Sequence, residues 1–80
     1  MARYNGHRSW NAWNVSLWIG NDEGLYRLAM DCIKSNRAKS SRYTLAAREF
    51  LDCVGEGSKT PDGAVYNFKC VREALASLES

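Results

Sequence analysis

The chain has 80 residues, of which 45% are hydrophobic and 25% are charged, a balance typical of a folded globular protein rather than a disordered one. Eleven Lys and Arg residues against nine Asp and Glu residues give a formal net charge of +2, too small for total charge to drive binding to nucleic acid or membrane. The length fits a single helical domain over residues 1–80 whose one apolar core provides little spare stability.

The first predicted helix is short and follows an irregular N-terminal arm of residues 1–8. Ser9 has the side chain of an N-cap, and we expect the helix to run to about Ile19 and to end at Gly20, which tolerates a left-handed backbone. All three tryptophans of the chain lie in this segment: Trp10, Trp13 and Trp18.

A second helix is predicted to begin at Asn21 as its N-cap, with acidic residues in the first turn, where the helix dipole favours negative charge. Apolar residues then recur at the spacing of one helical face. These residues are Leu25, Leu28, Ala29, Cys32 and Ile33. Lys34 lies in the last turn, and residues 35–41 are expected to form a polar connection.

The third and fourth helices show the same periodicity. Ser40 or Ser41 is expected to start the third helix and Gly55 to end it. Its predicted buried stripe is Tyr43, Ala46, Ala47, Phe50, Leu51 and Val54. Asn67 is expected to cap the last helix. The inner face of that helix is predicted to be Phe68, Val71, Leu75 and Leu78.

The segment between these two helices has the residue preferences of a tight turn. Thr60, Pro61, Asp62 and Gly63 follow one another, and proline presets the backbone at the second position of such a turn. Residues 64–66 are then expected to be extended. The fold class is therefore all-α, with about four helices in a small antiparallel bundle or in an orthogonal array, and the pattern leaves both open.

The sequence predicts no metal site, no cofactor site and no catalytic constellation. His7 is the only histidine, and no serine or cysteine stands in a recognisable nucleophile motif, so we expect no enzymatic activity. Ligands of structural zinc sites usually come in close pairs, which Cys32, Cys53 and Cys70 do not form. With an odd number of cysteines and no signal peptide or membrane span, we expect reduced thiols and a cytoplasmic location.

The tryptophan-rich helix allows two interpretations. Trp10, Trp13 and Leu17 share one face, and the first interpretation is that the rings form the core of a small protein. Trp18 lies on another side of the helix, so at least one ring is expected to be partly exposed. The second interpretation is therefore an aromatic anchor for a partner, with Trp18 and Tyr26 as the candidates, because Trp, Tyr and Arg are enriched among interface hot spots.

Basic residues form two zones that contain no acid. Arg3 and Arg8 lie in the N-terminal arm, and a second group lies between Asp31 and Glu49. That group is Lys34, Arg37, Lys39 and Arg42. A solvated basic loop is one explanation. The alternative is that these side chains contact phosphates or an acidic protein patch, in which case affinity falls steeply with salt.

The N-terminal third of the chain resembles a family of short, uncharacterised proteins of phage, prophage and archaeal genomes. The resemblance is carried by residues 4–6 and 9–26, and centres on Trp13-Asn14-Val15 and Leu17-Trp18-Ile19. The shared motif is similar to Asn-Tyr-Glu-Thr-Trp-Asn-Val-Ala-Leu-Trp-Ile. Residues 9–12 of this chain, Ser-Trp-Asn-Ala, stand where the family has Asn-Tyr-Glu-Thr.

The resemblance implies a phage-type accessory protein and no particular activity. Such an origin favours an inhibitor of a host defence complex, of the anti-CRISPR kind, that occludes a nucleic-acid or protein binding surface with basic and aromatic residues. The partner would be a host protein or ribonucleoprotein complex, with direct nucleic-acid contact possible. One alternative is a small phage DNA-binding or regulatory protein. Another is an oligomeric structural component, although we expect a monomer and no membrane partner.

Overall fold

The computed structural model describes residues 9–79, which fold into four helices, with one isolated backbone bridge and no strand in that range. Helix α1 spans Trp10–Asn21, α2 spans Glu23–Ser35, α3 spans Arg42–Val54 and α4 spans Phe68–Leu78. The prediction of a small all-α fold is confirmed. The predicted irregular arm, residues 1–8, lies outside the described residues.

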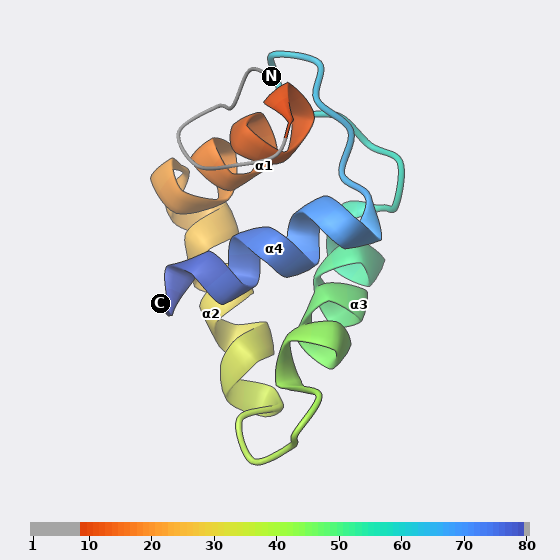
Figure 1. Ribbon diagram of the computed structural model, residues 1–80. Coiled ribbons are helices and arrows are strands. Elements are labelled where there is room, and N and C mark those ends of the chain that lie inside the picture. The colour runs from red at the N-terminus through yellow and green to blue at the C-terminus, as the bar shows by residue number, and fades with distance from the viewer. Residues whose placement is uncertain (1–8, 80) are drawn as a thin grey trace.

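The helices form an orthogonal array rather than an up-and-down bundle. Helices α2 and α3 run in opposite directions from the connection at the bottom of Figure 1, and α4 lies across this pair. Helices α2 and α4 each pack against all three other described helices, whereas α1 and α3 each pack against α2 and α4. Helices α2 and α4 together therefore join the four helices around one core.

The junction between α1 and α2 differs from the prediction. Gly20 does not end the first helix, because α1 continues to Asn21, and Asn21 is not the next N-cap. Asp22 serves both helices: its backbone N–H donates to the Trp18 carbonyl oxygen at 2.9 Å, and its Oδ1 accepts from the Leu25 N–H at 3.0 Å. A carboxylate is favoured at a helix N-terminus, so Asp22 caps α2 better than Asn21 and leaves no loop between the helices.

The other predicted helix ends are confirmed. The side chains of Ser9 and Asn67 each accept a hydrogen bond from the backbone N–H three residues further on, at 3.1 and 2.9 Å. Helix α3 follows Ser41, although no side chain caps it, and ends at Gly55, whose φ of +91° is a conformation that favours glycine.

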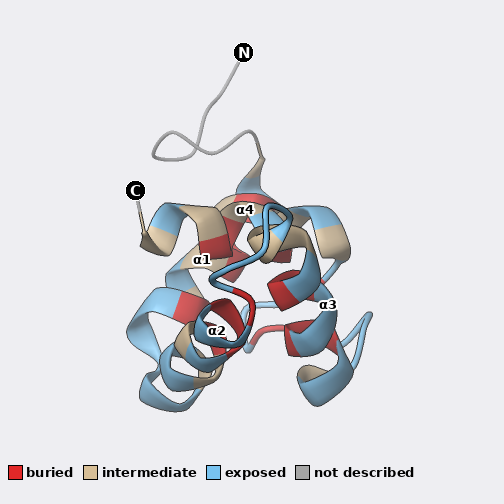
Figure 2. Ribbon diagram, turned by 90° about the horizontal axis from the view of Figure 1, so that it is seen from below, coloured by how far each residue is buried: buried red, intermediate tan, exposed pale blue. Residues whose placement is uncertain are grey.

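The core is built from the predicted stripes of α2, α3 and α4, and Figure 2 shows these buried residues on the sides of the helices that face one another. Its largest fully buried apolar side chains are Phe50, Ile19, Ile33, Leu75, Val15 and Val71. Tyr66, from the segment before α4, adds its buried ring against Phe50, with the ring centroids 6.3 Å apart.

The prediction that the tryptophans form this core is wrong. Helix α1 turns Val15 and Ile19 inward, whereas Trp10 is 39% exposed and Trp13 and Trp18 are half-buried. Compact β-branched side chains fill the narrow space between α1 and its neighbours, and the face that carries Trp10 and Leu17 points outward. The first of the two interpretations of the aromatic helix therefore fails.

A polar flank of α1 holds the segment that precedes α4. The side chain of Asn11 binds the backbone of Val65 twice: Nδ2 donates to the carbonyl oxygen at 2.9 Å, and Oδ1 accepts from the N–H at 2.7 Å. An amide side chain thus pairs with an extended backbone as a neighbouring strand would. Val65 also forms the isolated bridge with Lys59, so both sides of this short segment have partners.

Asn14 makes a second set of bonds one turn further along α1. Its side chain is only 2% exposed; Oδ1 accepts from the Thr60 hydroxyl at 2.7 Å and Nδ2 donates to Asp62 Oδ2 at 2.9 Å. The Trp18 indole N–H donates to the same Asp62 oxygen at 2.9 Å. We call Asn11, Asn14 and Trp18 with residues 60–65 the asparagine clasp.

The clasped segment is the predicted tight turn. The Gly63 N–H donates to the Thr60 carbonyl oxygen at 2.9 Å, which closes the turn, and the Thr60 hydroxyl accepts from the Ala64 N–H at 3.0 Å. Thr60 is 4% exposed and therefore connects the turn to Asn14 within the interior. The loop is held by side chains of α1 at positions about 50 residues away in sequence.

Replacing Asn14 by Ala is expected to lower the free energy of unfolding by about 2 kcal/mol, because Thr60 loses a buried hydrogen-bond acceptor. Urea unfolding followed by circular dichroism measures the change. Ser16→Ala, two residues away on the same helix, is the matched control and should shift stability much less. Equal effects of the two substitutions would contradict the clasp.

The clasp also predicts acid sensitivity. Hydrogen bonds from Asn14 and then Trp18 hold the pKa of Asp62 below its ordinary value. A lowered folded-state pKa stabilises the fold above the unfolded pKa near 4, and the contribution is lost as pH falls through the folded value. Asp62→Asn keeps an acceptor oxygen but does not titrate. The unfolding free energy of the Asp62→Asn variant should therefore fall less than that of the wild type between about pH 5 and 2. Urea unfolding at several pH values measures both. If the two free energies fall in parallel with pH, the prediction is wrong.

Candidate functional site

The predicted basic group gathers at the connection between α2 and α3, the lower end of the domain in Figure 1. We call this connection, with its flanking helix ends, the basic turn. Its cationic residues are Lys34, Arg37, Lys39 and Arg42. Lys34 lies in the last turn of α2 and Arg42 begins α3, and all four except the half-buried Arg42 are exposed. Arg3 and Arg8 lie outside the described residues.

The basic turn is held in place by Asn36, a residue that the sequence analysis did not single out. Asn36 is 2% exposed, and its Nδ2 donates to the Cys32 carbonyl oxygen at 2.9 Å and to Glu49 Oε2 at 3.0 Å. The Lys39 N–H donates to the Asn36 carbonyl oxygen at 3.0 Å. The cations therefore project from an ordered turn, which lowers the entropy cost of binding.

Glu79, just after α4, is a second carboxylate that meets the basic turn, and it pairs with one of the cations. Its Oε2 lies 2.9 Å from Arg37 Nη2, and its Oε1 accepts from the Tyr43 hydroxyl at 2.9 Å. The Tyr43 hydrogen bond first, and then Arg37 and the charge of Arg42, lower the pKa of Glu79. Burial of part of the side chain opposes this shift. Glu79 thus joins the end of α4 to the basic turn.

Two further arginines continue the basic surface along the contact between α3 and α4. The guanidinium of Arg48 lies over the Phe68 ring, 4.9 Å from its centroid, and Arg72 Nε donates to the Thr44 hydroxyl at 3.1 Å. Both arginines are exposed. At the turn, Arg42 lies similarly over the Tyr43 ring at 5.7 Å. We call this line the arginine seam: Arg37, Arg42, Arg48 and Arg72, with Tyr43, Thr44, Phe68 and Glu79.

The helical period explains why the seam is continuous. Phe68, Arg72 and Glu79 are spaced by four and seven residues, which places them on one flank of the α4 segment. Thr44 and Arg48 are likewise one turn apart on α3. The sequence analysis missed Arg48, although it ends the run without acids, and had no signal for Arg72, whose partner is set only by how α4 crosses α3.

The two predicted aromatic anchors do not join this surface. Trp18 and Tyr26 lie near the α1–α2 junction, at the other end of α2 from the basic turn (Figure 1). The indole N–H of Trp18 is bonded to Asp62, whereas Tyr26 is 42% exposed. The structure therefore divides the predicted contact set into a basic end and an aromatic end.

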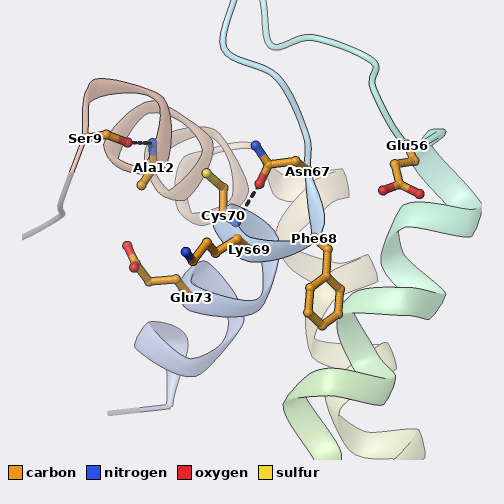
Figure 3. A pocket seen from close by; sticks show the side chains of 8 residues that line it. All are labelled: Ser9, Ala12, Glu56, Asn67, Phe68, Lys69, Cys70 and Glu73. Carbon is orange, nitrogen blue, oxygen red and sulfur yellow. Dashed lines mark hydrogen bonds between the residues drawn. The ribbon is translucent and has the colours of Figure 1, made fainter.

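A groove of about 660 Å³ lies between the starts of α1 and α4 (Figure 3). It is lined by Ser9, Ala12, Glu56, Asn67, Phe68, Lys69, Cys70 and Glu73. Ser9 and Asn67 use their side-chain oxygens to cap helices, and Cys70 Sγ accepts from Asn11 Nδ2 at 3.2 Å. These polar groups thus have structural partners, and those in the described range form no nucleophile and base pair.

The three cysteines are free thiols, outside any disulfide, and lie in different environments. Cys32 is buried, Cys53 is exposed and Cys70 is half-buried. Burial, followed by the nearby Glu49 carboxylate, raises the pKa of the Cys32 thiol to about 11. Cys32 therefore behaves as a small apolar residue of the α2 stripe, as its position in the sequence predicted.

This difference predicts the order in which the thiols react. The thiolate is the reactive form, so at about pH 8 the native protein should be labelled by a thiol reagent at Cys53 well before Cys32. Mass spectrometry of peptides from native and urea-unfolded samples measures the order, and Cys53→Ser removes the fast step. Early labelling of Cys32 in the native protein would contradict its burial.

Comparison with known proteins assigns the chain to a family. Residues 1–77 match the model of DUF7249, a family of unknown function. The chain belongs to DUF7249. Neither a curated protein nor a solved structure matches it. The family description names no phage and no defence system, so the expectations that rest on the resemblance stay predictions for this DUF7249 member.

Helix length and hydropathy bear on a membrane location. Among residues 9–79, no helix combines the length and the apolar composition that crossing a membrane requires.

Proposed function

We propose that this DUF7249 protein is a non-enzymatic binding domain that docks its basic turn on an anionic surface of a nucleic-acid-bearing complex. One observation carries the proposal. Four cationic side chains gather at one end of the fold, Glu79 forms an ion pair with one of them, Arg37, and no acid occurs from Cys32 to Arg48. The formal net charge of the chain is only +2, so the local gathering of cations, and not the total charge, supports the proposal.

The chemistry of the turn supports a phosphate-bearing partner. Arginine presents a planar set of donors that matches phosphate and carboxylate oxygens, and Arg37 and Arg42 are already oriented by Glu79 and Tyr43. Imitation of DNA is a poor alternative mechanism, because a DNA mimic requires a strongly acidic surface.

The most specific form of the proposal is a cytoplasmic inhibitor of a host defence complex, of the anti-CRISPR kind, that occludes the surface on which nucleic acid is bound. Its support is the phage-type motif of the first third of the chain together with the basic turn. The alternative is a small DNA-binding or regulatory protein, which the extension of the basic surface over α3 and α4 favours.

An affinity pulldown from a bacterial host lysate, with identification of the proteins and nucleic acids that co-purify, tests this proposal. Two variants remove three positive charges each. Lys34→Gln, Lys39→Gln and Arg42→Gln together change the basic turn, and Arg27→Gln, Lys59→Gln and Lys69→Gln change exposed cations elsewhere. We expect the wild type and the second variant to retain a nucleoprotein complex and the first variant to lose most of it.

The outcomes separate the candidates. Recovery of a CRISPR surveillance complex that depends on the basic turn supports the inhibitor, and recovery of DNA alone supports the DNA-binding alternative. Equal losses in the two triple variants would show that only overall charge matters. Equal retention would show that the basic turn is not the contact surface, and either result refutes the proposal.

A further inference from the structure

We infer that Arg48 and Arg72 form a binding site for backbone phosphates of nucleic acid, at the contact between α3 and α4. This inference rests on the proposed function in that the partner bears nucleic acid. It adds a second site, beyond the basic turn, and the chemical group that this site binds.

Two helices deliver the arginines to the same place. Thr44 precedes Arg48 by one turn on α3, and Phe68 precedes Arg72 by one turn on α4. The contacts cross over, since Arg72 bonds to Thr44 at 3.1 Å while Arg48 covers Phe68 at 4.9 Å. Both guanidinium groups are therefore fixed on the arginine seam by side chains of the opposite helix.

Most of the hydrogen-bonding capacity of the two groups remains for a ligand. A guanidinium has five N–H donors, and the bond to Thr44 uses only Nε of Arg72. The Arg48 guanidinium lies over the Phe68 ring, and among residues 9–79 no hydrogen bond occupies its N–H groups. Arginine can bind phosphate oxygens through two such N–H groups.

Carboxylates do not neutralise the pair within residues 9–79. Ion pairs in this range are made by Arg27 with Glu23 and by Arg37 with Glu79. Asp52 lies one turn after Arg48, yet it forms no ion pair with that arginine. A bound anion can therefore pair with both arginines.

The length and composition of the seam favour a polymer of phosphates. From Phe68 to Leu78 helix α4 rises about 15 Å, which covers several nucleotides of a duplex strand. The Phe68 and Tyr43 rings are half-buried and already covered by Arg48 and Arg42, so they offer little surface on which a base can stack. The seam therefore contacts the sugar-phosphate backbone of the nucleic acid and has no sequence preference.

Fluorescence anisotropy with a short labelled DNA duplex of mixed sequence, titrated at several salt concentrations, tests the site. We expect Arg48→Gln with Arg72→Gln to weaken binding roughly tenfold and to reduce the slope of log affinity against log salt by about two. The matched control, Arg27→Gln with Lys59→Gln, removes the same charge and should change the slope little. Arg48→Lys with Arg72→Lys keeps both charges and should restore most of the slope. Circular dichroism confirms that each variant is folded.

Several results would overturn the inference. One is a slope that is unchanged in the double Gln variant, and another is an equal loss in the control. Displacement of the duplex by inorganic phosphate or a nucleoside triphosphate, beyond what sodium chloride of equal ionic strength achieves, would assign the site to a free phosphate compound instead.

The pulldown distinguishes this failure from that of the proposed function. If the double Gln variant still captures the nucleoprotein complex and still binds the duplex, the seam site is wrong while docking through the basic turn stands. If the basic-turn variant keeps its partner while the double Gln variant loses the duplex, the seam site stands and the proposed docking surface is wrong.

Discussion

The rest of the structure depends on the asparagine clasp. Asn11 and Asn14 bind the backbone and side chains of residues 60–65, a segment that would otherwise be a surface loop. Because α4 begins directly after this segment, the clasp sets the position of its first turn, and the core stripe then sets its direction across α2 and α3. That crossing brings Arg72 to Thr44 and carries Glu79 to the basic turn. A polar contact near the N-terminus thereby determines a charged surface at the other end of the domain.

The clasp also gives the run from Trp13 to Ile19 a structural role. Within the run from Trp13 to Ile19, Asn14 and Trp18 hold the turn of residues 60–63, while Val15 and Ile19 enter the core. One short helix therefore provides both polar and apolar contacts that fix the fold. The residues of this run are thus occupied by structural contacts. Residues that bind a partner are to be sought away from the motif.

The sequence was sufficient where the forces are local. Helical period, caps such as Ser9 and Asn67, and the positive φ of Gly55 act within a few residues, so three of the four buried stripes and most helix ends could be predicted. The orientation of α1 could not, because Trp10 and Leu17 form a more hydrophobic face than the one that is buried. Only the clasp, whose partners lie about 50 residues away, decides which face turns inward.

The candidate site illustrates the same division between local and distant contacts. A run without acids located the basic turn, yet the order of that turn depends on the bond between Asn36 and Glu49, and the arginine seam depends on contacts between α3 and α4. A net charge of +2 is compatible with anion binding for this reason. Electrostatic interactions at the surface are screened within about 8 Å at physiological salt, so a ligand at the seam senses the neighbouring arginines rather than acids on distant helix faces. What decides binding is which charges the fold places together, and here α4 supplies both the carboxylate that partly neutralises the turn and the arginine that extends it.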